Sequence, residues 1–338
     1  MLKVGMLSFK NVFFMLAFSW SNFACADEVN IYSARHYDTD MEMYYEFTRQ
    51  TGIQVNLIEG SSDALIQRLL NEAELSPADL LITVDAGRLW RAQQEDLFQA
   101  IQSDMLEKRI PSHLRHPQGL WFGLSKRARV IVHSKDLDFQ PKNYEDLAHP
   151  ELRGLVCMRS SSNIYNLSLM ASLIAANSAE RAEKWANALV ANFARKPQGN
   201  DTAQLRAVAS GECGVTIANT YYLGRFLASE KEVDKEMLAS LEVIFPNQLG
   251  RGAHVNISGA GVVRHSPNKD NAIKFLEYLT SDFAQKLFSE GNNEYPIIGE
   301  VSGPIRELGV FKEDKLLSSV LGANQREAVM IFDRAGWR

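Results

Sequence analysis

Strand-like and helix-like segments alternate along most of the chain, and this alternation restricts the fold more than any other feature. Residues 29–33 form a short β-like run, 53–57 alternate as in a half-buried strand, and 79–84 (DLLITV) are continuously apolar. A continuous apolar run of this length is typical of a strand covered on both faces. Helical spacing of apolar residues separates these strands at 39–50 and 65–70. The order predicts an open α/β sheet in the first part of the chain.

The first of these helices has recognisable ends. Thr39-Asp40-Met41-Glu42 matches a capping box, in which the side chains of Thr39 and Glu42 each accept a hydrogen bond from the other residue's backbone amide. Gly52 can adopt the left-handed conformation that ends a helix. We therefore expect a helix that starts after Thr39 and runs to about Gln50.

The same alternation restarts in the second half of the chain. Residues 154–158, 214–218 and 258–264 are strand-like. Amphipathic helical segments lie between and after them, near 164–176, 179–192, 203–210, 268–280 and 282–289. A chain of 338 residues has the length of about two domains. The sequence therefore predicts two α/β lobes.

Charge and cysteine content exclude several classes of protein. The chain has 36 Lys and Arg against 41 Asp and Glu, a formal charge of −5 that gives no basic excess for nucleic-acid binding. Three cysteines are too few for a disulfide scaffold or a cysteine-based zinc module. Cys157 and Cys213 could form a disulfide or stay as buried thiols.

No nucleophile elbow, phosphate-binding loop or H-E-x-x-H motif is present, so we expect no enzyme.

The first 26 residues have the pattern of a secretory signal peptide. Two lysines precede the apolar run 12–20, and Ala24 and Ala26 are the small residues of an A-x-A cleavage site. The run is shorter than a membrane-spanning helix of about 20 residues. Cys25 raises the alternative of lipid attachment, although its sequence context is poor for it. We expect cleavage after Ala26 and export of the remaining chain.

Tyrosines follow the expected strands at three strand-to-helix junctions. Tyr37, Tyr165, Tyr221 and Tyr222, four of the ten tyrosines, stand at these positions. In open α/β sheets, ligands bind beyond the carboxyl ends of the strands, where helices begin. If a helix starts near residue 220, Arg225 shares a face with Tyr221 and Tyr222.

A convergent set of phenols has a definite chemical use. Fe³⁺ is a hard cation, and tyrosine is a known iron ligand in proteins. Four phenolates around Fe³⁺ would carry a net charge of −1, which a guanidinium could offset. The alternative interpretation is that these tyrosines pack at the edge of a sheet with their hydroxyl groups in water. Periodicity alone does not bring the three junctions together.

The chain also resembles a known family over nearly its whole length after residue 26. Motifs spread along the chain carry the resemblance: Ile31–Tyr37 (IYSARHY), Ser76–Asp79 (SPAD), Leu89–Ala92 (LWRA), Lys126–Arg129 (KRAR), Ser160–Asn163 (SSSN), Gln198–Gln204 (QGNDTAQ), Ala218–Tyr222 (ANTYY), Phe245–Gln248 (FPNQ) and Ala335–Trp337 (AGW). Together they resemble the periplasmic ferric-iron-binding proteins of iron ABC transporters, and most of all their FutA-like branch.

The resemblance implies a set of iron ligands. The paired tyrosines that bind iron in this family match Tyr221 and Tyr222, and the branch adds tyrosines that match Tyr37 and Tyr165. His36 matches a histidine that ligates iron in some members and does not in others.

The same resemblance implies charge partners and one departure from the family. Arg127 and Arg225 are expected to balance the phenolate charge without ligating iron. One branch of the family uses a glutamate just after the third strand, where this chain has Val84, and Tyr165 is expected to replace it. An all-tyrosine set leaves fewer coordination positions for a bound carbonate or phosphate.

The family fold is the two-lobed periplasmic substrate-binding protein fold of type II, in which two α/β lobes are joined by crossing hinge strands. We place the crossings near 125–130 and 255–258. The expected division is a signal peptide at 1–26, an N-terminal lobe of 27–126 and 257–296, and a C-terminal lobe of 127–256 and 297–338.

The function that the resemblance implies is capture of ferric iron, with Fe²⁺ as an alternative cargo, for an inner-membrane ABC permease. We expect a periplasmic monomer in which iron binds the phenols of the second lobe and closure then adds Tyr37. Two alternatives belong to other classes. A binding protein of the same fold for an organic or anionic solute would stay colourless with iron, and an exported hydrolase would need a nucleophile and base that the sequence does not show.

Overall fold

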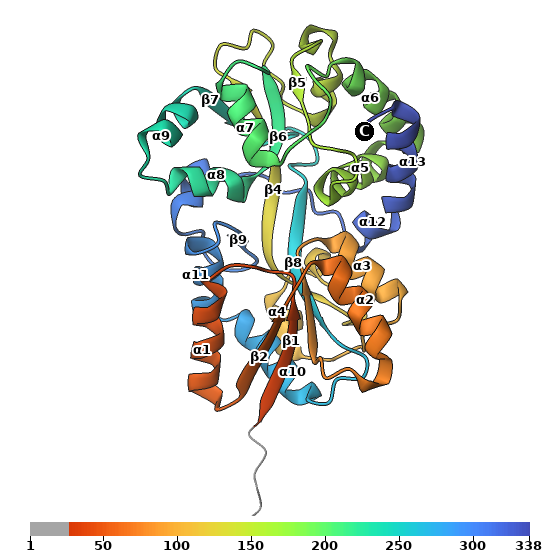
Figure 1. The fold of residues 1–338 in the computed structure, drawn as a ribbon, viewed down its shortest axis with the longest axis vertical. Coiled ribbons are helices and arrows are strands. Elements are labelled where there is room, and N and C mark those ends of the chain that lie inside the picture. Colours follow the sequence, from red (N-terminus) through yellow and green to blue (C-terminus); the bar gives the residue numbers. More distant parts are fainter. Residues whose placement is uncertain (1–26) are drawn as a thin grey trace, which may run out of the picture.

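The protein has two lobes stacked along its longest axis (Figure 1). The computed structural model describes residues 27–338, so the expected signal peptide, Cys25 and the cleavage site lie outside the described residues. Strands β4 (Phe122–Ser134) and β8 (Val255–Val262) run from one lobe into the other. Within the described part of the chain, no helix is both long enough and apolar enough to span a membrane.

The first lobe is built on the predicted α/β alternation. Strand β1 (Glu28–Ser33) pairs in parallel with β2 (Gln54–Glu59) and with β3 (Leu80–Thr83), and β3 pairs antiparallel with β8. The helices of this lobe are α1 (Asp40–Thr51), α2 (Ser62–Glu72), α3 (Ala86–Gln94), α4 (Asp104–Arg109), α10 (Lys269–Leu279) and α11 (Asp282–Glu290). The predicted strands and helices are therefore confirmed, while β8 makes the sheet mixed.

The start of α1 differs from the predicted capping box. Thr39 has helical backbone angles, with φ −66° and ψ −22°, and its side chain caps no amide of the helix. Its hydroxyl instead donates a hydrogen bond to Asn292 Oδ1. The predicted end is confirmed, because Gly52 has φ 76° and its amide donates to Thr48 O.

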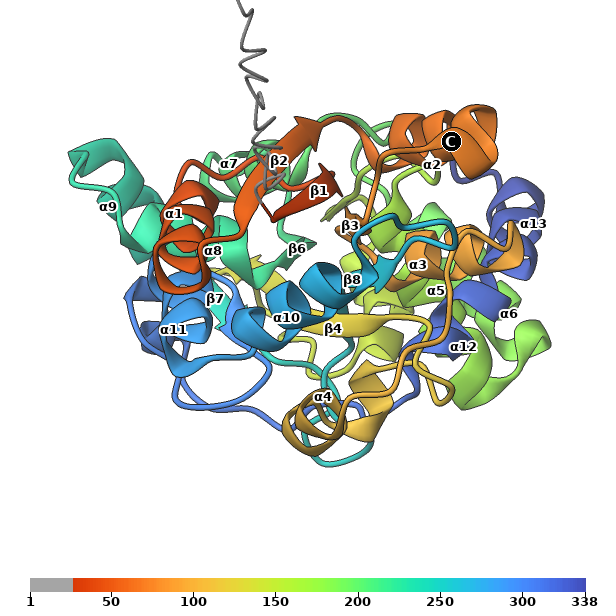
Figure 2. The ribbon, with the colours of Figure 1, turned by 90° about the horizontal axis from the view of Figure 1, so that it is seen from below.

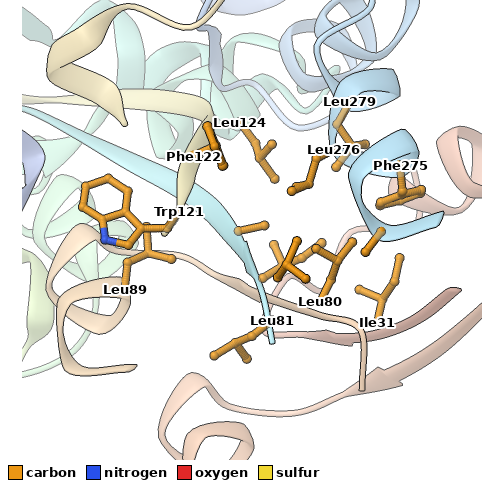
Figure 3. Close-up of a cluster of buried hydrophobic side chains, with 14 of the residues drawn as sticks. Ile31, Leu80, Leu81, Leu89, Trp121, Phe122, Leu124, Phe275, Leu276 and Leu279 are labelled. Atoms are coloured by element: carbon orange, nitrogen blue, oxygen red, sulfur yellow. The ribbon is translucent and has the colours of Figure 1, made fainter. Parts of the chain in front are cut away.

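Helices cover both faces of the first-lobe strands. Seen from below, α1 and α10 lie on one side of these strands and α2 and α3 on the other (Figure 2). The alternation of side chains along β1 follows this arrangement, because the hydroxyl of Tyr32 donates to Glu72 of α2 while Ile31 lies near Phe275 of α10. Figure 3 shows the buried α10 side chains on the side opposite Leu89 and Trp121. Burial on both faces explains the continuous apolar run of β3.

The second lobe is a smaller sheet wrapped by helices. Strand β4 pairs with β6 (Val215–Asn219) and β7 (Leu241–Ile244), and β6 pairs in parallel with β5 (Val156–Cys157). Its helices are α5 (Ile164–Asn177), α6 (Ala179–Ala191), α7 (Asp201–Ala209), α8 (Thr220–Leu227), α9 (Glu232–Ala239) and α13 (Gln325–Ala335). Two cores fill this lobe on the two sides of its strands, separate from the core of the first lobe.

We propose that the lobes divide at the boundaries expected from the resemblance. The first core draws its members from 29–124 and 257–297, with one further residue, Leu321. The other two cores draw theirs from 128–241 and 328–337. Leu321 belongs to α12 (Ser318–Ala323), which packs on both α3 and α5, so this helix contacts the two lobes on one side of the molecule.

Cys157 and Cys213 form a disulfide between β5 and the turn before β6, which settles the choice that the sequence left open. The two cysteines are 56 residues apart in the chain. Closing a loop of that length removes about 4 kcal/mol of chain entropy from the unfolded state. We therefore expect Cys157→Ala/Cys213→Ala to lower the free energy of unfolding by about that amount in a denaturant titration. Reduction of the wild-type protein should give a similar loss, and an unchanged midpoint in both would contradict the prediction.

Candidate metal centre

Tyr221 and Tyr222 project from the first turn of α8. Strand β6 ends at Asn219, and α8 begins at the next residue, so both tyrosines stand at the carboxyl end of a central strand. Their rings stack with centroids 4.2 Å apart. Tyr221 is buried and Tyr222 is half-buried. The helix start predicted near residue 220 is confirmed, and it places adjacent phenols at a helix N-terminus, which favours negative charge.

Tyr165 comes to the same place from α5. The side chain of Asn163 caps this helix by accepting a hydrogen bond from the amide of Tyr165. The cap fixes Tyr165 in the first turn, where its hydroxyl lies 3.2 Å from that of Tyr221. Two tyrosines that are 56 residues apart in the chain therefore share one hydrogen bond.

Tyr37 approaches from the other lobe. It lies in the loop between β1 and α1, with the guanidinium carbon of Arg35 4.9 Å from its ring centroid. Arg225 of α8 lies 5.8 Å from the Tyr37 ring, 5.2 Å from Tyr221 and 5.6 Å from Tyr222. One guanidinium thus lies against tyrosines of both lobes.

Three more arginines surround Tyr165. The guanidinium carbons of Arg127, Arg129 and Arg159 lie 5.6, 5.8 and 5.6 Å from its ring centroid. Arg129 and Arg159 both bind the buried Asp201, at 2.8 and 2.9 Å. Asp201 also accepts from the amide of residue 219, at the end of β6, so it ties α7 to the strand that leads into α8.

Of the three arginines around Tyr165, Arg127 has two donor nitrogens without a partner among the described residues, and the other two have one each. It lies on β4, is buried, and donates from Nη1 to Ser258 Oγ at 2.9 Å. Glu294 Oε1 lies 3.8 Å from the same nitrogen. Among the described residues, its Nε and Nη2 have no hydrogen-bond partner. Buried guanidinium donors are normally satisfied, so Arg127 is suited to balance negative charge in the site.

Burial keeps the phenols protonated in the absence of a metal. Desolvation raises the pKa of Tyr37, Tyr165 and Tyr221 above the ordinary value for tyrosine. Arg127 opposes this effect at Tyr165, whereas the neighbouring phenolate charges of Tyr165, Tyr222 and Tyr37 raise the pKa of Tyr221 further. The phenols of both lobes therefore influence one another's protonation. A strong cation among them would reverse the balance and favour the phenolate forms.

His36 does not join the four tyrosines. Its side chain is 56% exposed, and its Nδ1 lies 3.5 Å from Glu59 Oε1 at the end of β2. Its role as a ligand stays a prediction, and ligation would need the ring to turn from Glu59. The position of Val84, where one branch of the family has a glutamate, is followed by the buried Asp85. That carboxylate caps α3 and accepts from Ser168 and Asn256, so it is used between the lobes.

Several charged residues of the site carried no role in the sequence interpretation. These are Arg35, Arg129, Arg159, Asp201 and Glu294, all of which lie within the ion-pair networks around the tyrosines. Motif runs that include Arg35, Arg129 and Asp201 were part of the family resemblance, and this was the available signal. In residues 27–338, no group of three or more His, Cys, Asp or Glu side chains could hold a metal ion.

Two lobes joined by crossing strands, with a cluster of polar side chains between them, define a solute-binding protein. The chain belongs to the family of bacterial extracellular solute-binding proteins, whose family model matches residues 76–306. The expected fold is confirmed by solved structures of that class, which cover more than nine-tenths of this chain.

Particular relatives agree with the resemblance to FutA-like proteins. Iron uptake protein A1 of Synechocystis sp. (strain ATCC 27184 / PCC 6803 / Kazusa) is 49% identical over 316 residues, 92% of this chain and 88% of the relative. The structure of Trichodesmium FutA (IdiA) in complex with iron and citrate is 52% identical with a TM-score of 0.89, covering 92% of this chain and 100% of that one. The structure of apo FutA2 from Synechocystis PCC 6803 is 47% identical with a TM-score of 0.88, covering 93% of this chain and 100% of that one. The predicted family is thereby confirmed.

Proposed function

We propose that this protein binds ferric iron between its lobes through the phenolates of Tyr37, Tyr165, Tyr221 and Tyr222. The observation that carries the proposal is the convergence of these phenols from both lobes. The hydroxyl groups of Tyr165 and Tyr221 lie 3.2 Å apart. Arg225 lies beside the rings of Tyr37, Tyr221 and Tyr222. Phenolate oxygen is a hard anionic donor suited to Fe³⁺. The names of the relatives, an iron uptake protein and a FutA bound to iron and citrate, support the same cargo.

Charge balance supports the assignment. Four phenolates and Fe³⁺ sum to −1, and both Arg127 and Arg225 lie close enough to the rings to offset this charge. Arg127 is buried with free donors, whereas Arg225 is exposed and reaches across the cleft. We assign both as charge partners that do not ligate iron. His36 remains an additional candidate ligand.

Capture proceeds by closure of the lobes. Tyr165, Tyr221 and Tyr222 belong to the second lobe and form the initial site, and Tyr37 completes it when the lobes close. The closed form is the state that an inner-membrane ABC permease would recognise, and the protein would act in the periplasm as a monomer after cleavage behind Ala26. This is a transport role and not catalysis. Reduction to Fe²⁺, a weaker partner for phenolate, would favour release.

A visible absorption titration tests the proposal. Ferric citrate added to the purified protein is expected to produce a broad phenolate-to-iron charge-transfer band that saturates at about one equivalent, because phenolate ligation creates this transition. Citrate alone and ferric citrate without protein serve as controls. A colourless protein whose thermal stability does not change with iron would contradict the proposal and favour a binding protein for an organic or anionic solute.

A further inference from the structure

Three consecutive polar residues are buried between α11 and β9 (Tyr295–Pro296). Asn292, Asn293 and Glu294 are only 1%, 6% and 1% exposed. Burying polar side chains is costly unless they are hydrogen-bonded. The side chains of Asn292 and Glu294 are hydrogen-bonded, whereas Asn293 Oδ1 has no partner among the described residues. We call residues 292–294 the NNE segment. Each of its members contacts a different part of the proposed iron site.

Asn292 holds the residues that follow Tyr37. Its Oδ1 accepts a hydrogen bond from the hydroxyl of Thr39, and its Nδ2 donates to Asp40 Oδ1 at 2.7 Å. Asp40 in turn binds Arg35 Nε at 2.8 Å. These contacts replace the predicted helix cap and fix the loop on the C-terminal side of Tyr37.

Glu294 joins the Tyr37 loop to the crossing strands. It binds Arg35 Nη1 at 2.8 Å and accepts from Ser125 Oγ of β4 at 2.6 Å. Arg127, the next arginine along β4, lies 3.8 Å away. Arg35 lies against the ring of Tyr37 and Arg127 against that of Tyr165. The carboxylate therefore links the two arginines that face tyrosines of opposite lobes.

Asn293 packs against the helix that carries the paired tyrosines. In Figure 1, α8 lies directly above β9 and the end of α11. A Cβ atom built on Gly224 of α8 would lie 2.6 Å from Asn293 Cβ, closer than two carbons can approach. Asn293 itself has φ 56°, in the left-handed region. Gly224 lies three residues after Tyr221, so this close approach sets the distance between α8 and the NNE segment.

Glycine within a helix needs a reason, because it is less favourable than alanine by roughly 0.5–1 kcal/mol. Leu223 and Phe226 on either side of Gly224 belong to a core of the second lobe, whereas Phe288 and Ile297 around the NNE segment belong to the core of the first. The Gly224–Asn293 contact is thus a contact between lobes. The absence of a side chain at Gly224 is what lets α8 approach.

We propose that the NNE segment is a positioning element of the iron site: it holds the Tyr37 loop and, through the close contact of Asn293 with Gly224, sets how far α8 closes toward Tyr37. This inference rests on the proposed ferric-iron function. The segment does not touch the metal. It acts by placing Tyr37 and the pair Tyr221–Tyr222 at the separation that lets one cation bind all of them.

The variant Gly224→Ala tests the positioning role. The added methyl group favours the helix, so thermal stability of the metal-free protein should not fall, but it collides with Asn293 when the lobes close. We expect iron to dissociate at least about tenfold faster into excess chelator, in the range found when residues that orient ligands are lost. The charge-transfer band of the iron complex should shift toward that of Tyr37→Phe, because Tyr37 is the ligand left behind.

Two matched double variants separate this role from a general disturbance of α8. Gly224→Ala/Asn293→Gly removes the atoms that collide, and glycine accepts the positive φ, so slow iron release should return. Gly224→Ala/Asn293→Ala keeps the Cβ that lies 2.6 Å away and should not restore it. The inference would be overturned if Gly224→Ala released iron at the wild-type rate, or if the two double variants released iron at equal rates. If wild type itself formed no band with iron, the proposed function would fail instead.

Discussion

Tyr221→Phe/Tyr222→Phe is expected to remain folded and to lose ferric iron binding. The substitutions keep both rings, whose stacking at 4.2 Å and packing on α8 need no hydroxyl. The hydroxyl of Tyr221 contributes one internal hydrogen bond, to Tyr165, so the free energy of unfolding should change by about 1 kcal/mol or less. Iron loses two of four anionic ligands, and Tyr165 is the one proposed ligand that the second lobe keeps.

The loss in affinity should exceed about 100-fold, since removal of residues that merely orient ligands already costs 10–100-fold. Competition against a ferric chelator measures the affinity, and a thermal melt of the metal-free protein checks the fold. Tyr45→Phe is the matched control, because Tyr45 is 71% exposed on α1. It should bind iron as wild type does. Retention of wild-type affinity by the double variant would refute ligation by the pair.

The elements that position the site follow from local sequence pattern. The apolar pattern gives β1, α1, β3 and α5 within a few residues, because these elements bury a stripe or a face whose spacing is visible in one segment. The placing of tyrosines at strand-to-helix junctions also follows, since the carboxyl ends of strands in such sheets are where ligands bind. The family motifs then supply which junctions meet.

Contacts between distant segments could not be read in the same way. Thr39 has the residues of a local capping box, yet its hydroxyl binds Asn292, 253 positions later. The capping box was the wrong prediction because a tertiary partner competed with the local one. The contact of Glu294 with Arg35, 259 positions away in the chain, could not be predicted from periodicity for the same reason.

The sequence also does not predict the direction in which a loop side chain points. His36 and Tyr37 are adjacent in the sequence and were both candidate ligands, but one faces Glu59 and the other faces Arg225. No local pattern shows which of two adjacent loop residues contacts the other lobe, because this depends on charged residues far away in the sequence. The resemblance named both, and the structure brings only Tyr37 to the other tyrosines.

Iron binding is expected to weaken steeply as the pH falls. Burial raises the pKa of Tyr37, Tyr165 and Tyr221, so these phenols are protonated at neutral pH in the metal-free protein. Each phenol that becomes a ligand must lose its proton. For each proton that binding displaces, the affinity for iron falls tenfold when the pH falls by one unit. Four phenolate ligands therefore give up to about 10⁴-fold per pH unit.

Proton release measures this coupling directly. In unbuffered solution held at pH 7 by added base, the protons released when ferric citrate loads the protein are counted per iron bound for wild type and for Tyr37→Phe. Tyr37→Phe should release one fewer, because chelator and iron hydrolysis contribute equally to both titrations. Equal proton counts for the two proteins would mean that Tyr37 is not a phenolate ligand. The acid sensitivity then has a functional consequence for the proposed site. The pKa values that burial raises at Tyr37, Tyr165 and Tyr221 would make release of iron responsive to protons as well as to reduction, whether or not His36 also ligates the metal.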